Sequence, residues 1–385
     1  MTRLLHMLIS AMLLPLLLFA QDNGSSAQKG QAKTPESIQT GVLVPAAAQA
    51  VSSEFRTHGG SIASEVPQGQ SQSQQKPKPS KPSPGSTESG KAPIEGSMVG
   101  YIDNAIVGSQ IRLRFDIGFD NNRPDRAEFF YAQCGCNGGN APGPKPGLVT
   151  NLNFQQLYMR AEYAPVRRFS AFFELPVRWV QPQTFAPGTT PGFPDQAGLS
   201  DVQAGLKFAA LATHERYLTF QFLADFPSGD SSKGLGTNHY SIGPSLLFFQ
   251  KVTDRFSIEA QVGDWHPIGG SSAVVNGATR GFAGDVFNYG FGPSYELYRS
   301  ERVRVAPVIE IVGWSVLGGL ETNGDLINTL SGPIVHSDGT NIVNVKIGVR
   351  TSIGDHNSFY VGYGQAVTHE LWYKHIVRLE YRYAF

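Results

Sequence analysis

Apolar and polar residues alternate along most of the chain beyond residue 109, and the pattern is clearest in residues 375–385. Successive side chains of a strand point to opposite sides, so this segment predicts a strand with one apolar face and one charged face. A transmembrane β-barrel needs such strands, because its outer face meets lipid and its inner face meets water or a polar plug. The apolar face comprises His375, Val377, Leu379, Tyr381, Tyr383 and Phe385, and the other comprises Ile376, Arg378, Glu380, Arg382 and Ala384.

The same alternation predicts twelve strands in all, at 109–119, 156–163, 169–179, 201–208, 218–226, 240–248, 256–262, 287–297, 302–311, 343–353, 359–363 and 375–385. Short connections (165–168, 212–216, 251–255, 299–302 and 354–357) alternate with longer ones (120–150, 180–199, 227–237, 264–284, 317–340 and 365–371). Short periplasmic turns opposite long outer loops are typical of outer-membrane barrels. We therefore predict an all-β, transmembrane, antiparallel up-and-down β-barrel of about 12 strands, closed by pairing of the last strand with Ile111–Phe119.

The segment before the barrel divides into two parts. Residues 1–20 combine an early Arg3 with a short apolar run that ends on Ala20, which predicts a cleaved secretory signal peptide. Residues 21–95 are rich in Gln, Ser, Pro and Lys, and they predict a disordered periplasmic linker. The linker is either a plain spacer or a tether whose lysines contact the acidic cell wall. Residues 96–385 are assigned to the barrel.

Composition excludes several other classes of protein. The chain has 31 basic and 31 acidic residues, so no electrostatic case for nucleic-acid binding exists. Beyond the signal segment no apolar run reaches 18 residues, which excludes helical membrane spans. With 43 Gly, 24 Phe and 14 Tyr residues, the composition suits a β-barrel better than an ordinary globular enzyme.

The residues with reactive side chains do not predict an enzyme. The sequence has no His-Glu-x-x-His, no Gly-x-Ser-x-Gly and no Walker-type loop, and no cofactor is predicted. His239 and Ser241 share a strand face, but period-two spacing makes such pairs common, so a barrel enzyme is the least favoured alternative. Cys134 and Cys136 predict a strained local disulfide in an exported chain. A metal site would need two further ligands, and none is predicted.

The inward strand faces predict a lumen lined by charges of both signs. Unpaired buried ions are costly, so these charges either form a salt-bridged interior that holds the wall together or line a polar pore with a slight basic excess that favours anionic solutes. The lumen-facing candidates are Arg112, Arg114, Arg160, Glu162, Glu174, Arg178, Glu259, Arg304, Glu310, Arg350, Arg378, Glu380 and Arg382. Four aromatic residues are expected to share this face, where they either pack or line a path for a ring-shaped solute: Tyr158, Phe172, Trp265 and Trp314.

Two stretches carry a resemblance to a known family. They are Gly198-Leu-Ser-Asp-Val-Gln-Ala-Gly-Leu-Lys-Phe208 and Phe226-Pro-Ser-Gly-Asp230 running into His239-Tyr-Ser-Ile-Gly-Pro-Ser245. Together with Phe385, they resemble the outer-membrane β-barrel family described as meta-pathway phenol-degradation proteins or transporters. The resemblance covers residues 108–385. It implies an outer-membrane channel for hydrophobic or aromatic solutes, and it supplies no catalytic residues.

These observations predict a bacterial outer-membrane channel for the diffusion of small solutes, with its N-terminal linker in the periplasm. The alternative is a structural barrel that anchors a periplasmic tether. The expected partners are outer-membrane lipid, the barrel-insertion machinery, the cell wall through the linker, and a solute that the residues do not identify. Tyr381, Tyr383 and Phe385 are the predicted insertion signal, because the ending resembles the C-terminal signature of bacterial outer-membrane proteins.

Overall fold

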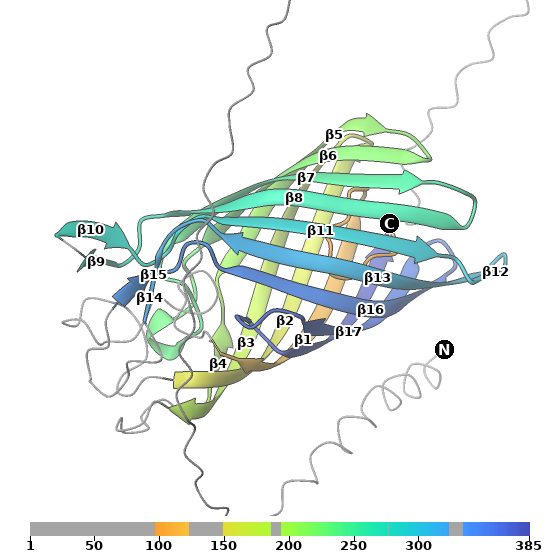
Figure 1. Ribbon diagram of the computed structural model, residues 1–385. Coiled ribbons are helices and arrows are strands. Elements are labelled where there is room, and N and C mark those ends of the chain that lie inside the picture. Colours follow the sequence, from red (N-terminus) through yellow and green to blue (C-terminus); the bar gives the residue numbers. More distant parts are fainter. Residues whose placement is uncertain (1–96, 123–148, 186–193, 276, 323–333) are drawn as a thin grey trace, which may run out of the picture. The chain divides into compact units, whose positions relative to one another are not determined.

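A computed structural model describes residues 97–122, 149–185, 194–275, 277–322 and 334–385. The predicted signal peptide, the linker and the Cys134–Cys136 pair lie outside the described residues. Within them, twelve long antiparallel strands form a closed barrel (Figure 1). The strands are β1 (Gln110–Asn121), β2 (Val149–Val166), β3 (Phe169–Phe185), β5 (Val202–Ala212), β6 (Arg216–Phe226), β7 (Tyr240–Lys251), β8 (Phe256–Ile268), β11 (Val286–Tyr295), β13 (Val303–Val316), β16 (Asn341–Ile353), β17 (Asn357–Ala366) and β18 (His375–Ala384).

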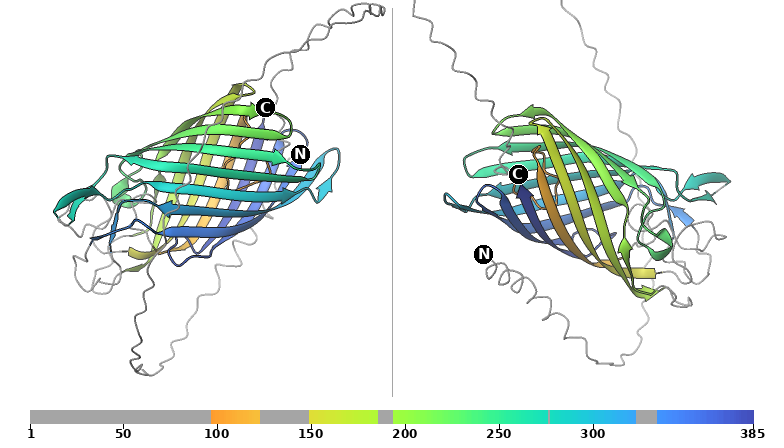
Figure 2. Two further views of the ribbon diagram at one scale, coloured as in Figure 1. Left: turned by 45° about the horizontal axis from the view of Figure 1, so that its top comes forward. Right: turned by 180° about the vertical axis from the view of Figure 1, so that it is seen from behind.

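The first and last strands close the barrel, as the sequence predicted. β1 and β18 pair antiparallel from Ile111 opposite Tyr383 to Phe119 opposite His375. Each remaining strand pairs with its neighbours in the chain, and β11 pairs directly with β13. The views in Figure 2 show the strands tilted around one lumen. The all-β class, the twelve strands and the closure are therefore confirmed.

The alternation of residues along each strand separates an apolar outside from a polar inside. On β1, Ile111 and Leu113 are 46% and 42% exposed, whereas Arg112 between them is 6% exposed. On β18, Ile376, Arg378, Glu380 and Arg382 are buried, and the odd positions lie at least partly exposed. A strand with this period-two pattern places every second side chain in the lumen, so burial here means inclusion within the barrel.

The two ends of the barrel differ in their connections. The short turns, Ser109 and Phe385 lie at one end, which we call the turn end. The connections after β1, β3, β6, β8, β13 and β17 lie at the other, which we call the loop end. The smaller elements are β4 (Gln196–Leu199), the 3-10 helix η1 (Ser231–Lys233), β9 (Ser272–Val275), β10 (Ala278–Gly281), β12 (Tyr298–Arg299), β14 (Leu320–Thr322) and β15 (Ile334–His336). Within the described ranges, no helix is long and apolar enough to cross a membrane.

Candidate functional site: a plugged, charge-lined lumen

Residues 97–109, which we call the plug, form a loop inside the lumen just before β1. Both ends of this loop lie at the turn end: Arg382 donates to the Ser97 hydroxyl at 3.5 Å, and the Phe385 N–H donates to the Ser109 carbonyl at 3.2 Å. At its middle, the Asp103 N–H donates to the Gln261 side chain at 2.7 Å. The plug therefore enters the lumen and leaves it at the same end, without spanning the barrel.

Two lumen carboxylates accept the backbone N–H groups of the first limb of the plug. Glu310 accepts from Gly100, Tyr101 and Ile102 at 3.1, 2.8 and 2.8 Å. Glu259 accepts from Met98 at 3.0 Å and from Val99 at 3.4 Å. Since a buried backbone donor without a partner is costly, these two side chains supply what a neighbouring strand would supply in a sheet.

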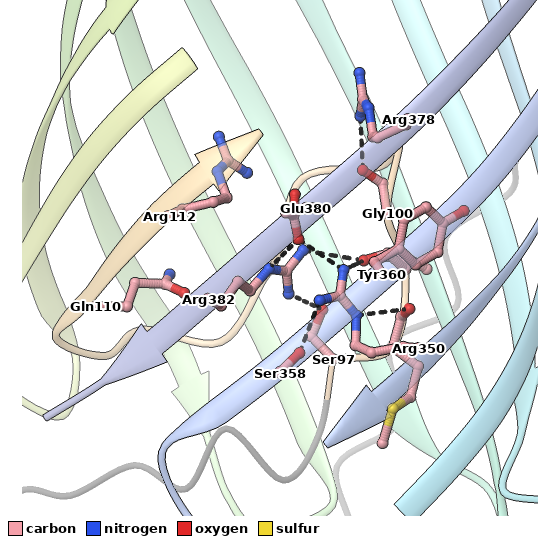
Figure 3. Close-up of polar contacts among 12 residues, drawn as sticks. Ser97, Gly100, Gln110, Arg112, Arg350, Ser358, Tyr360, Arg378, Glu380 and Arg382 are labelled. Carbon is pink, nitrogen blue, oxygen red and sulfur yellow. Dashed lines mark hydrogen bonds and ion pairs between the residues drawn. The ribbon is translucent and has the colours of Figure 1, made fainter. Parts of the chain in front are cut away.

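Three lumen arginines donate to the carbonyl groups of the same limb (Figure 3). Arg350 donates to the carbonyls of Met98 and Val99 at 3.0 and 2.7 Å. Arg382 donates to the Val99 carbonyl at 3.0 Å, and Arg378 donates to the Gly100 carbonyl at 2.6 Å. Charge-assisted bonds of this kind are stronger than neutral ones, so the first limb is firmly held.

The second limb is held by one lysine, one neutral hydroxyl and apolar packing. Lys207 donates to the Asn104 carbonyl at 2.9 Å, and the Thr219 hydroxyl donates to the Ala105 carbonyl at 2.5 Å. Apolar side chains of both limbs pack into two clusters with the wall. One contains Met98, Val99, Ile102, Ala306, Val308, Val312 and Tyr360, and the other contains Ala105, Ile106, Val107, Ala209, Tyr217, Leu247 and Phe249.

Glycine makes room for the plug on β11. A Cβ atom at Gly292 would lie 2.9 Å from Cγ1 of Val99, closer than real Cβ contacts allow. Gly290, two residues earlier, faces Ile102 in the same way at 3.0 Å. The wall of β11 is therefore shaped to receive the first limb.

Asp103 lies at the middle of the plug, where its carboxylate faces the basic part of the lumen. Gln221 donates to this carboxylate at 2.9 Å. Burial alone would raise the pKa of the Asp103 carboxyl, but the positive charges of Arg160, Arg112 and Lys207 outweigh it and lower the pKa to about 2. The carboxylate therefore stays ionised at neutral pH.

A cavity of about 370 Å³ lies in the lumen on the loop-end side of the plug, which we call the loop-side cavity. Its lining contains six cationic side chains and four carboxylates. These are Arg112, Arg114, Arg160, Arg178, Lys346 and Arg378, against Asp103, Asp116, Glu174 and Asp264. The lining also contains seven aromatic side chains: Tyr101, Phe154, Tyr158, Trp265, Trp314, Trp372 and Tyr373. An apolar cluster that includes Trp372, Tyr373 and Leu235 packs toward the loop end.

A second cavity, of about 490 Å³, opens at the turn end and is lined by Ile106 of the plug together with Glu296, Arg302 and Arg304. The plug thus separates two polar cavities of the same lumen. One cavity therefore lies on each side of the plug.

The structure places the sequence-predicted lumen candidates in three groups. Glu259, Glu310, Arg350, Arg378 and Arg382 bond to the plug. Arg112, Arg114, Arg160, Glu174 and Arg178 line the loop-side cavity. The other three pair within the lumen: Glu162 with Lys207, Glu380 with Arg350, and Arg304 with Glu296 at the turn end. Eleven of the thirteen are buried, and Arg114 and Arg304 are partly exposed.

The other candidates are more scattered. Tyr158, Trp265 and Trp314 line the cavity, and the Phe172 ring lies 3.5 Å from the guanidinium carbon of Arg160. In the predicted insertion signal, Tyr381 is partly exposed, and Tyr383 and Phe385 are 39% and 52% exposed. The Ser241 hydroxyl donates to Asp225 at 2.9 Å, and His239 Nδ1 lies 2.9 Å from the Thr237 carbonyl. The Ser241 hydroxyl therefore donates to a carboxylate rather than to His239.

Sequence reasoning missed the plug, although Met98, Val99, Ile102, Ile106 and Val107 form an apolar cluster directly after the Pro-rich linker. It also missed Trp372 and Tyr373, which lie in a connection rather than in a strand. A further group was not foreseen: Asp264, His266 and Asp285 at the loop end offer ligand atoms within 4.8 Å of one another. His266 Nδ1 lies 2.6 Å from an Asp285 carboxylate oxygen, as in an ordinary surface pair.

No protein-family model matches the chain, and no curated protein matches it. Among solved structures, an outer membrane channel from Pseudomonas putida F1 is 15% identical, with a TM-score of 0.46 over 72% of this chain and 96% of that chain. The β domain of the Bordetella autotransporter BrkA is 13% identical (TM-score 0.42, 72% and 100% covered). The KdgM porin is 9% identical (TM-score 0.36, 72% and 99% covered). The resemblance to the phenol-degradation family stays a prediction.

Proposed function

We propose that this protein is a bacterial outer-membrane channel whose lumen is closed by its own N-terminal plug and conducts small solutes when the plug moves. The observation that carries the proposal is the placement of the plug. It lies between a cavity of about 370 Å³ and one of about 490 Å³, and both of its ends lie at the turn end. Such a segment can withdraw without breaking any strand pairing of the barrel.

The outside of the barrel supports a membrane location. Large apolar side chains point outward from strands all around it, among them Leu113, Phe173, Phe208, Phe222, Val262, Phe291, Ile309, Ile347 and Val361, each at least 42% exposed. A soluble barrel would leave this surface in water at a large free-energy cost, whereas lipid covers it. Insertion by the barrel-insertion machinery, with the linker in the periplasm, belongs to the same proposal.

The test is the conductance of the full chain in planar lipid bilayers. In the test variant, residues 98–107 are replaced by a Gly-Ser segment of equal length. The matched control replaces 272–281, which contains the β9–β10 hairpin that pairs only with itself. Because the first replacement removes the side chains that pack the plug into the wall, we expect its conductance to rise about tenfold or more over the wild type. The control should match the wild type. Equal conductance of all three proteins would overturn closure by the plug, and no conductance from any of them would overturn the channel.

The firm hold of the lumen on the plug also favours a second function, a structural barrel that anchors the N-terminal linker. The first limb by itself accepts bonds from three buried arginines and donates bonds to two buried carboxylates. Under this function, the plug-replaced variant stays non-conducting, and deletion of residues 21–95 alters the attachment of the outer membrane to the cell wall. An unchanged envelope after that deletion would remove the anchor.

A further inference from the structure

Two arginines of the loop-side cavity have guanidinium N–H groups that lack a close hydrogen-bond acceptor in the protein. Arg160 is 6% exposed, and its Nε and Nη2 atoms have no hydrogen-bond acceptor among the described residues. Its nearest carboxylate oxygen, on Glu162, lies 3.6 Å from Nη2. Arg114 likewise lies 3.5 Å from Asp116 and 3.6 Å from Glu174, beyond good hydrogen-bond distance.

The rings beneath these two groups hold them in place. The guanidinium carbon of Arg114 lies 3.6 Å from the centre of the Tyr158 ring, and that of Arg160 lies 3.5 Å from the centre of the Phe172 ring. Arg114 and Arg160 are diagonal neighbours on one face of the paired strands β1 and β2. Two adjacent planar donors, stacked on rings and short of acceptors, are well suited to bind a carboxylate or phosphate.

The opposite side of the same cavity is aromatic. Trp265 comes from β8 and Trp314 from β13, two strands far from β1 and β2 around the barrel. Trp372 comes from the connection before β18, the strand next to β1, and its ring lies against Trp314. The Trp314 and Trp372 rings lie 4.9 Å apart, centre to centre. A flat apolar group can pack against such rings, while water gains little there.

Asp103 of the plug is a carboxylate that the basic wall of the cavity already stabilises. Asp103 stays ionised in a largely enclosed position because Arg160, Arg112 and Lys207 outweigh the effect of burial on its pKa. With six cationic groups against four carboxylates, the cavity still carries a positive excess after Asp103 is counted. A further negative charge is therefore favoured in the cavity.

We propose that the loop-side cavity binds a small aromatic carboxylate, with the carboxylate at Arg114 and Arg160 and the ring against Trp265, Trp314 and Trp372. The site deepens the proposed function, because it assigns a solute class to the channel. A volume of about 370 Å³ is at the small end of the range for ligand pockets, so it accommodates a single-ring compound.

Intrinsic tryptophan fluorescence of the full-length protein in detergent micelles tests the site directly. Three of the four tryptophans line the cavity, and Trp179→Phe removes the signal of the fourth. Benzoate, benzyl alcohol and acetate are titrated at constant ionic strength. We expect a saturable change with benzoate and at least about tenfold weaker binding of the other two probes. Benzyl alcohol lacks the charge-assisted hydrogen bonds, each of which contributes about 1.5–3 kcal/mol, and acetate lacks the ring that packs against the tryptophans.

Arg114→Gln and Arg160→Gln should each weaken benzoate binding about tenfold or more, because each removes one charge-assisted donor pair. Arg216→Gln, at an exposed arginine of the turn end, is the matched control and should bind as the wild type does. Two separate variants keep the test valid if one of them fails to fold.

Three results would overturn the inference. Equal binding of benzyl alcohol would show an apolar site, equal binding of acetate would show a plain anion site, and no saturable change would show no site. The inference and the proposed function can also be told apart. Saturable benzoate binding by a barrel that never conducts supports the site and rejects the channel, whereas conduction without benzoate binding rejects the site alone.

Discussion

The two halves of the lumen use the same residue types with different results. Toward the turn end, Arg350 and Arg382 bond to carbonyl groups of the plug and to Glu380 of the wall. In the wall of the loop-side cavity, Arg114 and Arg160 lie on aromatic rings and have long contacts to carboxylates. An extended peptide fills the first half, and a cavity occupies the second.

The difference shows what a peptide segment does inside a barrel. Its N–H and carbonyl groups satisfy charges of both signs at once, so the turn half needs no solvent to compensate its buried ions. The plug turns back at Asp103, and beyond this point the wall arginines depend on other carboxylates, on rings or on a solute. Stability should therefore reside in the turn half, and solute recognition in the loop half.

The largest expected effect is that of Arg350→Ala. The change removes the donors to the Met98 and Val99 carbonyls and one partner of Glu380, all within a buried region. Removing one member of a buried ionic network costs about 3–5 kcal/mol, so the free energy of unfolding should fall by about that amount. Urea unfolding measures it, and bilayer conductance should rise because the first limb is released.

Arg216→Ala is the control for Arg350→Ala. Arg216 is exposed at the turn end and donates to Gln250, without contact to the plug. Its loss should change the free energy of unfolding by at most about 1 kcal/mol. If Arg350→Ala behaves like this control, the plug is not held by the arginines of the turn half.

A smaller effect is expected from Gly292→Ala, which alters the fit of the plug without removing a charge. The added Cβ would lie 2.9 Å from Val99 and 3.1 Å from Glu310, and such overpacking typically costs about 1–3 kcal/mol. Gly243→Ala places a Cβ in the loop half at 3.4 Å from Leu223, which is ordinary contact. Urea unfolding should separate the two variants, and equal losses would mean that β11 is not shaped to the plug.

The sequence predicted the wall of the barrel because residues that face lipid are apolar, residues that face the lumen are polar, and the two kinds alternate along each strand. Ile111, Arg112 and Leu113 suffice to assign inside and outside on β1, and the other strands repeat the rule. The lengths of the connections then gave the order of short turns and long loops. These signals are local, so they are visible in a single sequence.

The plug and the cavity were not predictable in this way. The plug is bound largely through its backbone N–H and carbonyl groups, which every residue type can offer, so the sequence does not reveal these contacts. Gly100 and Ser97, for example, are residue types that are also common in the linker. Trp372 belongs to a connection without periodicity, so no pattern assigns it to the lumen. Arg114 and Arg350 both appear in the sequence as inward-facing arginines of a strand. Only the structure shows that Arg350 bonds to the plug and that Arg114 does not.

The second limb of the plug offers a weaker contact to break. Thr219→Val removes the hydroxyl that donates to the Ala105 carbonyl and preserves the shape of the side chain. A neutral hydrogen bond contributes about 1 kcal/mol, so the free energy of unfolding should fall by about that much. Thr219→Ser should restore it. A loss as large as that of Arg350→Ala would show that the second limb, rather than the first, anchors the plug.

The smallest effect on stability is expected from Arg114→Gln in the loop half. Without Arg114, Glu174 keeps Arg112 at 2.8 Å and Asp116 keeps Arg378 at 2.7 Å, so neither carboxylate loses its main partner. The protein loses chiefly the stacking on Tyr158, which is worth about 0.5–1 kcal/mol. The midpoint of urea unfolding should therefore shift far less than in Arg350→Ala. Comparable shifts in the two variants would mean that Arg114 holds the wall together as Arg350 does, and that both halves of the lumen are structural.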